Sequence, residues 1–150
     1  MCIRDRLYEA LFVPPGKPKF PRSILEDPGI KKYISHWNQQ KGDIAIVAIT
    51  SGELVGAIWG KIFKEDKKGY GYVDDATPEI SMAIKEGYRN RGLGTELLKQ
   101  IEIEYKGKGI EQLSLSVDKV NPAKGLYERT GYSIYKEEGT AFIMVKKLTI

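Results

Sequence analysis

The sequence predicts an α/β fold in which one mixed sheet carries helices on both faces. Residues 113–117 alternate apolar and polar side chains with the period of two that is typical of a strand. Residues 92–105 instead place leucine, isoleucine and tyrosine at the period of an amphipathic helix. The predicted order along the chain is helix, helix, hairpin, strand–helix–strand, helix and hairpin. Because 150 residues is the length of one domain, we expect residues 1–150 to form a single unit.

The N-terminal part of the chain predicts two short helices joined by a rigid connector. Residues 7–12 are typical of the end of a helix, which a proline pair then terminates. Four prolines between positions 14 and 22 favour a stiff connector over a flexible linker. Asp27 and Pro28 supply an N-cap and a first-turn proline for the second helix. Its apolar side is expected to carry Ile30, Tyr33, Ile34 and Trp37.

The middle of the chain predicts a hairpin followed by a third strand. Residues 43–50 and 54–63 are rich in Ile, Val, Ala and Trp, and a Ser-Gly-Glu turn separates them. Because the first run is apolar on both faces, we expect it to lie centrally in the sheet. Residues 64–75 predict a polar loop, and residues 79–84 predict the next strand.

The C-terminal part predicts one more helix and a last hairpin. Asn121 and Pro122 repeat the cap-plus-proline pattern and predict a helix that runs to about Arg129. Two short strands at 132–135 and 140–147 complete the predicted sheet.

Composition and charge exclude several classes of protein. Hydrophobic content of 41% and charged content of 29% are globular values, and the longest uncharged apolar run, residues 44–49, is too short to span a bilayer. The net charge of +4 suits an anionic small molecule, but basic and acidic residues are interspersed, so we expect no nucleic-acid partner. Cys2 is the one cysteine and no secretion signal is recognisable. We therefore expect a cytoplasmic protein with no membrane partner and no metal.

The segment that carries chemistry runs from the third predicted strand into the amphipathic helix. The first N–H groups of a helix lack internal partners and carry the positive end of its dipole. Gly92 and Gly94 allow an anion to approach that backbone closely, while Arg89 and Arg91 add full positive charges. Together these features predict a cradle for a diphosphate.

Two established phosphate motifs fail at this cradle. A dinucleotide-binding fingerprint requires a third glycine where Leu97 stands. A P-loop requires a lysine after the second glycine, where Thr95 stands. A glycine-containing turn with incidental charges stays open as the alternative.

Two blocks of this sequence resemble the GNAT superfamily of N-acetyltransferases. Arg89-x-x-Gly92-x-Gly94 matches the family signature (Gln/Arg)-x-x-Gly-x-(Gly/Ala), and residues 115–132 resemble the second conserved block. The blocks occur in family order, and the resemblance spans residues 43–147. The family's first strand has no counterpart here, and residues 1–6 resemble a translated sequencing adapter. We therefore expect a truncated chain that lacks the first strand and begins with non-native residues.

The resemblance implies a GNAT fold, with a mostly antiparallel sheet that splays between the parallel strands 79–84 and 113–117. Acetyl-CoA would lie in that gap, with its pantetheine arm along the first of these strands and its pyrophosphate on the amides of residues 89–95. The implied cofactor-binding residues are Met82, Ala83, Ile84, Arg89, Asn90, Arg91, Gly92, Leu93, Gly94, Thr95, Asn121 and Tyr127.

The resemblance also implies direct attack of a primary amine on acetyl-CoA in a ternary complex, without an acyl-enzyme. Tyr127 would protonate the departing thiolate as general acid, and core packing is its alternative role. Glu79 would act as general base through a water, and a solvated surface charge is its alternative. Asp74 and Asp75 are weaker candidates for the base.

Other features of the sequence leave the function partly open. Asn121 is fully explained as an N-cap, although in the family this position often also contacts the cofactor. His36 is expected to pack or face solvent rather than to catalyse. The amine acceptor would be selected by residues 8–40 and 64–78, which match no acceptor class. Homodimers are common in the family, and a non-catalytic acyl-CoA sensor or interaction module is the rival function.

Overall fold

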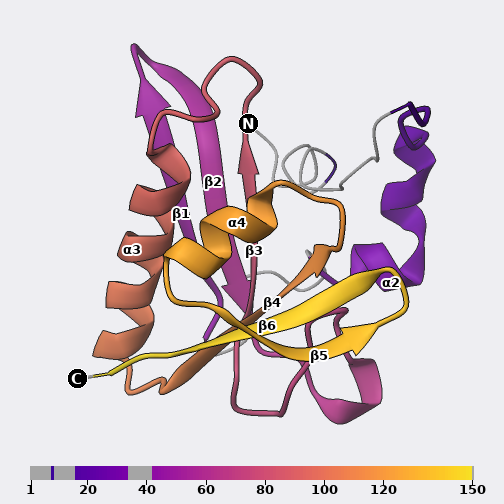
Figure 1. Cartoon of the computed structure of the whole chain (residues 1–150), viewed down its shortest axis with the longest axis vertical. Helices are drawn as coiled ribbons and strands as arrows, with labels where there is room; N and C mark the ends of the chain where they lie inside the picture. The colour runs from indigo at the N-terminus through magenta and orange to yellow at the C-terminus, as the bar shows by residue number, and fades with distance from the viewer. Residues whose placement is uncertain (1–7, 9–15, 34–41, 150) are drawn as a thin grey trace.

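A six-stranded mixed sheet forms the centre of the protein, in the strand order β1-β2-β3-β4-β6-β5 (Figure 1). The structure is a computed structural model that describes residues 8, 16–33 and 42–149. The strands are β1 Ile44–Thr50, β2 Glu53–Lys61, β3 Glu79–Ile84, β4 Gln112–Asp118, β5 Ser133–Glu138 and β6 Ala141–Lys147. The helices are η1 Arg22–Glu26, α2 Pro28–Lys31, η2 Glu65–Lys67, α3 Leu93–Gly107 and α4 Ala123–Arg129. Neighbouring strands are antiparallel except β3 and β4, which are parallel.

Helical segments cover both faces of the sheet, as the sequence predicts. On one face, α3 buries Leu97, Leu98 and Ile101 against strand residues such as Ile58 and Ile80. A second cluster packs η1 and α2 against the opposite face; it contains Leu25, Ile30, Tyr33, Ala57, Trp59, Phe63 and Ala83. Because side chains alternate along a strand, successive residues of β2 and β3 pack alternately into these two cores. In Figure 1, α3 and α2 accordingly lie on opposite sides of the sheet.

The parallel strands β3 and β4 meet at one end and then separate. Glu79 and Ser114 are their one registered pair, and the Ser114 amide donates to the Pro78 carbonyl at 3.0 Å. Further along, the Lys85 amide donates to β2 instead, so by the alternation of a strand the peptide groups of Met82 and Ile84 point away from β2. These groups face the gap between β3 and β4, which confirms the splayed sheet.

The prediction that residues 43–50 lie centrally is wrong, because β1 is an edge strand. Ile44, Ile46 and Ala48 pack against the core beneath α3, whereas Val47 and Ile49 on the other face are 49% and 62% exposed. The buried strand is its hairpin partner β2, in which every residue from Val55 to Lys61 is buried. An apolar sequence on both faces therefore did not distinguish a covered strand from an edge strand.

From β1 onward the elements follow the predicted order, apart from the short helix η2 within the predicted loop. Ser51 and Gly52 both have positive φ, 51° and 77°, which suits the tight turn of the first hairpin. Between the predicted connector and α2 lies a helix that the sequence did not predict, η1, which buries Leu25 at 1% exposure. None of the described helices combines the length and apolar character that crossing a bilayer requires. The predictions for Cys2, Ile34, His36, Trp37, residues 1–6 and most of 7–12 fall outside the described residues.

Candidate active site

A cavity of about 1280 Å³ follows the divergence of β3 and β4. All of β3 lines it, together with Ser116 and Val117 of β4. One end reaches the start of α3 and the inner side of α4, where Asn121 and Tyr127 lie. The other end reaches the segment that precedes β1 and the loop after β2, through Tyr33 and Tyr70. One continuous space therefore joins the predicted phosphate cradle to the predicted base.

The cradle is a concave turn that presents free backbone amides. Asn90 and Gly92 have φ of 61° and 79°, and such left-handed positions turn successive N–H groups toward one side. Among the described residues, none accepts a hydrogen bond from the amides of residues 92–95. Leu93 begins α3, so the positive end of its dipole points the same way. The turn is therefore built to receive an anion.

The two glycines of the signature have different structural reasons. A Cβ at Gly92 would meet nothing within 4 Å, so this glycine is required by its left-handed backbone. A Cβ at Gly94 would lie 2.8 Å from Leu126 Cδ2, so this glycine lets α3 approach α4 closely. The expectation that Gly94 serves anion approach thus has a packing explanation beside it.

The arginines of the cradle are fixed differently. Arg89 Nε donates to the Ile84 carbonyl at the end of β3, 3.2 Å away, and the residue lines the cavity. The Arg91 guanidinium lies over the Tyr88 ring, 5.5 Å from its centroid. Unlike the other predicted cofactor residues, Arg91 and Leu93 do not line the cavity.

Helix α4 brings Asn121 and Tyr127 to the cavity wall. The Ala123 amide donates to Asn121 Oδ1 at 2.9 Å, so Asn121 caps the helix as expected and still lines the cavity. The Tyr127 ring is half-buried, and its hydroxyl bonds to no described residue. Burial raises the pKa of Tyr127 to about 12. The phenol is therefore protonated at neutral pH and available to a ligand.

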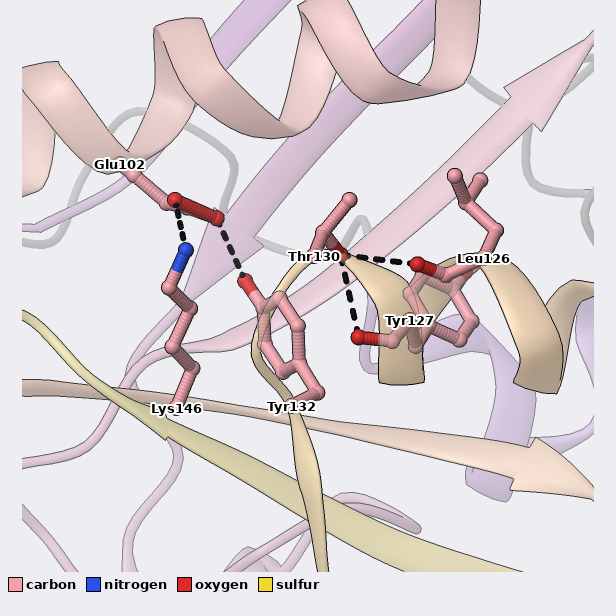
Figure 2. A network of polar contacts seen from close by, with 6 residues as sticks. All are labelled: Glu102, Leu126, Tyr127, Thr130, Tyr132 and Lys146. Carbon is pink, nitrogen blue, oxygen red and sulfur yellow. Dashed lines mark hydrogen bonds and ion pairs between the residues drawn. The ribbon is translucent and has the colours of Figure 1, made fainter.

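Figure 2 shows the contacts that hold the Tyr127 end of α4. Thr130 Oγ1 donates to the carbonyl of Tyr127 at 3.1 Å and to that of the preceding residue at 3.0 Å. The Tyr132 ring packs edge-on to Tyr127, with centroids 5.9 Å apart, and its hydroxyl donates to Glu102 of α3 at 3.3 Å. Lys146 of β6 pairs with the same carboxylate at 2.7 Å. These contacts fix the Tyr127 ring between α3 and the sheet.

Glu79 is a buried carboxylate at the closed end of the β3–β4 gap. It is 4% exposed, which contradicts its alternative role as a solvated surface charge. Tyr33 donates to its Oε2 at 2.6 Å, and the Gly71 amide donates to its Oε1 at 3.0 Å. Burial raises the pKa of Glu79 to about 7, although both hydrogen bonds and the charge of Lys32 lower it. The carboxylate therefore changes its charge near neutral pH.

The loop after β2 closes over this carboxylate. The Tyr70 amide donates to the Tyr33 hydroxyl at 2.7 Å, and the two rings stack 6.2 Å apart. A Cβ at Gly69 would lie 2.1 Å from Glu79 Oε1, so only glycine allows the loop to pass this closely. Because Tyr33 and Glu79 are 46 residues apart, no local sequence pattern predicts their bond. The two glycines at 69 and 71 were the one available sign of a close backbone approach.

The weaker candidates for the base lie elsewhere. Asp74 accepts a hydrogen bond from the Ala76 amide at 2.8 Å, and Asp75 accepts one from the Tyr72 hydroxyl at 2.5 Å. Both are exposed and neither lines the cavity between β3 and β4. Within the described residues, histidine, cysteine and acidic side chains form no group able to hold a metal ion.

Comparison with known proteins identifies the fold. PaiA N-acetyltransferase from Thermoplasma acidophilum, solved in complex with coenzyme A, is 21% identical with a TM-score of 0.64, over 97% of this chain and 90% of that one. The GNAT domain of S. lividans PAT is 16% identical with a TM-score of 0.70, over 97% and 84%. The acetyltransferase yncA from Salmonella typhimurium, solved with acetyl-CoA and described as putative, is 17% identical with a TM-score of 0.67, over 99% and 87%. The sequence model of the Acetyltransferase (GNAT) family matches residues 5–132, so this chain belongs to the GNAT acetyltransferase family.

Proposed function

We propose that this protein is a cytoplasmic N-acetyltransferase that moves an acetyl group from acetyl-CoA to a primary amine in a ternary complex. The observation that carries the proposal is the continuous cavity between β3 and β4, with free amides at one end and a buried carboxylate at the other. Its volume of about 1280 Å³ exceeds that of a pocket for one drug-sized ligand, which suits two substrates bound together.

The residues present fit acetyl-CoA. The peptide groups of Met82 and Ile84 face the gap, where amide-bearing pantetheine would pair with them as an added strand does. The free amides of residues 92–95 and the charge of Arg89 suit the pyrophosphate. When bound, acetyl-CoA supplies the acetyl group as an activated thioester.

Tyr127 is the proposed general acid. Its hydroxyl bonds to no described residue and borders the cavity, so it can donate its proton to the thiolate that leaves when the carbon–sulfur bond breaks. The Ile84 N–H points into the same gap and would donate to the thioester carbonyl oxygen, where negative charge develops. Because Tyr127 is held by α4 and its neighbours, it keeps its place without a bound ligand.

Glu79 is the proposed general base. An amine arrives as an ammonium ion and must lose one proton before nitrogen bonds to the acetyl carbon. Glu79, with a pKa of about 7, can take that proton at neutral pH, through a water that bridges it to the amine. The hydrogen bonds from Tyr33 and Gly71 hold its two oxygens, so the carboxylate is oriented before the amine binds.

Calorimetric titration with acetyl-CoA tests the proposal. We expect saturable binding by the folded protein, and no binding at high micromolar concentration would end the hypothesis. Turnover is then measured with a panel of amines by release of free CoA thiol. Tyr127→Phe should keep the binding and lose the turnover, whereas the exposed Tyr135→Phe serves as the matched control. Binding without turnover of any amine would indicate the non-catalytic acyl-CoA sensor instead.

A further inference from the structure

The cavity continues past Glu79 into a pocket that the proposed chemistry does not yet use. We name it the acceptor pocket and define it by the lining residues Tyr8, Lys19, Phe20, Ile30, Tyr33 and Tyr70. It lies on the face of β3 that carries Glu79, Ser81 and Ala83, opposite the core beneath α3. The pantetheine gap and the acceptor pocket therefore meet at Glu79.

The acceptor pocket exposes aromatic surface. Phe20 and Tyr70 are 40% and 54% exposed although both border the cavity. Tyr33 stacks on Tyr70 with an angle of 10° between the rings, which keeps that wall flat. Exposed rings that line a cavity favour a ligand with a flat apolar part, because aromatic pairs add to the gain from burial.

The charges of the acceptor pocket disfavour a polycation. Arg22 lies over the Tyr8 ring at 5.0 Å and Lys32 over the Tyr70 ring at 5.4 Å, so the protein's own cations already occupy ring faces. Lys19 adds a third cation at the exposed rim. Two glutamates line the cavity among the residues described here: Glu79, which is buried beside Tyr33, and Glu86, which is exposed after the far end of β3. The pocket thus has a single deep anion and a positive rim.

We propose, on the basis of the proposed function, that the acceptor is a ring-bearing monoamine with an anionic group at its far end. Its ammonium group approaches Glu79, its ring lies against Phe20 and the part of Tyr70 that Tyr33 and Lys32 leave exposed, and its anion faces Lys19. One amine matches one deep carboxylate, and the anion complements the positive rim. A polyamine would place further positive charges beside Lys19 and Lys32.

The experiment compares three amines: para-(aminomethyl)benzoate, its uncharged-tail analogue benzylamine, and spermidine. For the wild-type protein we expect kcat/KM to fall in that order, with about a twofold to fivefold advantage of the carboxylate over benzylamine, as suits one exposed charge pair. Lys19→Ala should abolish that advantage by lowering kcat/KM for the carboxylate more than for benzylamine. Lys17→Ala, an exposed lysine that does not line the cavity, is the matched control and should change neither.

Two results would overturn the inference while the proposed function stands: spermidine preferred to both ring-bearing amines, or an unchanged advantage of the carboxylate in Lys19→Ala. Turnover of no amine by protein that binds acetyl-CoA would defeat the proposed function. Titration of para-(aminomethyl)benzoate onto the CoA-saturated protein then tests binding to the acceptor pocket independently of turnover. Binding tighter than that of spermidine, and weakened by Lys19→Ala, would support it; any other result would overturn it.

Discussion

Tyr33→Phe tests whether a single hydrogen bond sets the pH at which the proposed base works. The Tyr33 phenol donates to Glu79 Oε2 at 2.6 Å, and this bond lowers the pKa of Glu79 while burial raises it to about 7. The ionised carboxylate gains more from the phenol than the neutral acid does. Removing the hydroxyl should therefore raise the pKa of Glu79 further.

The magnitude follows from the kind of bond. A hydrogen bond to a charged group is worth about 1.5–3 kcal/mol, and one pKa unit is about 1.4 kcal/mol, so the expected rise is about one to two units. The base must be ionised to work, so kcat/KM rises with pH through the pKa of Glu79. The midpoint of this rise should move from about pH 7 to about pH 8–9, with about a fivefold or larger loss at neutral pH.

The assay measures the acetylated amine formed in a fixed time, over a series of pH values, for the wild type and for Tyr33→Phe. Tyr105→Phe is the control, because it removes another buried phenol, one that donates to the Gly42 carbonyl at 2.7 Å and belongs to the core on the opposite face of the sheet from Tyr33. Thermal denaturation checks that each variant is folded. The reasoning is refuted if Tyr33→Phe loses the same fraction of activity at every pH, with its midpoint where the wild type has it.

Three further predictions concern the acid, the base and the helix contact. Tyr127→Phe should lower kcat by about 100-fold or more with acetyl-CoA affinity retained in titration. Glu79→Gln should remove the rise of kcat/KM near neutral pH. This variant should also melt at a higher temperature than the wild type at about pH 8 but not at about pH 5, because ionising the buried carboxylate lowers the stability of the wild type by up to about 3 kcal/mol. Gly94→Ala should lower the free energy of unfolding in urea by about 1–3 kcal/mol, because its methyl would overlap Leu126.

Each of these predictions has a contrary outcome. Equal activity of Tyr127→Phe and wild type would exclude the phenol as the acid. Burial raises the pKa of Glu79 above its ordinary value, so its carboxylate destabilises the folded protein only when it is ionised, which is complete above about pH 7. A difference in melting temperature between Glu79→Gln and wild type that does not depend on pH would contradict this. Gly107→Ala is the control for Gly94, because a Cβ there meets nothing within 4 Å and should stabilise α3. Equal effects of the two substitutions would rule out the Leu126 contact.

Elements with a local signal were predicted closely. Strand β3 was expected at 79–84 and occupies Glu79–Ile84, because its ends are set by Pro78 and by the turn that follows. Helix α4 follows the predicted cap, which the bond between Asn121 and the Ala123 amide supplies. Because each of these signals lies within a few residues of the element that it specifies, it can be recognised without knowledge of the fold.

The position of β1 and the environment of Glu79 depend on parts of the chain that are distant in sequence. The apolar pattern of 43–50 was correct for a strand, but whether other elements cover both its faces is decided by packing. Likewise Glu79 resembles a surface charge in sequence and is buried because Tyr33 and the loop at 69–71 fold onto it. The residues around the cavity were inferred largely from a family resemblance, and the acceptor pocket had no sequence pattern of its own.

The geometry of β3 is compatible with one short strand bordering both proposed substrates. Its odd-numbered side chains, from Glu79 to Ala83, face α2 and the acceptor pocket, while Met82 and Ile84 face α3 and α4. Its backbone bonds to β2 along one edge and has the β3–β4 gap along the other. Glu79 stands where β3 is still paired with β4, so the proposed base is held by a closed sheet, and the cavity proposed for the thioester follows further along β3. A shift of β3 by one residue against β2 would turn the carboxylate into the core beneath α3, so the register between β2 and β3 is as necessary to the proposed chemistry as the carboxylate itself.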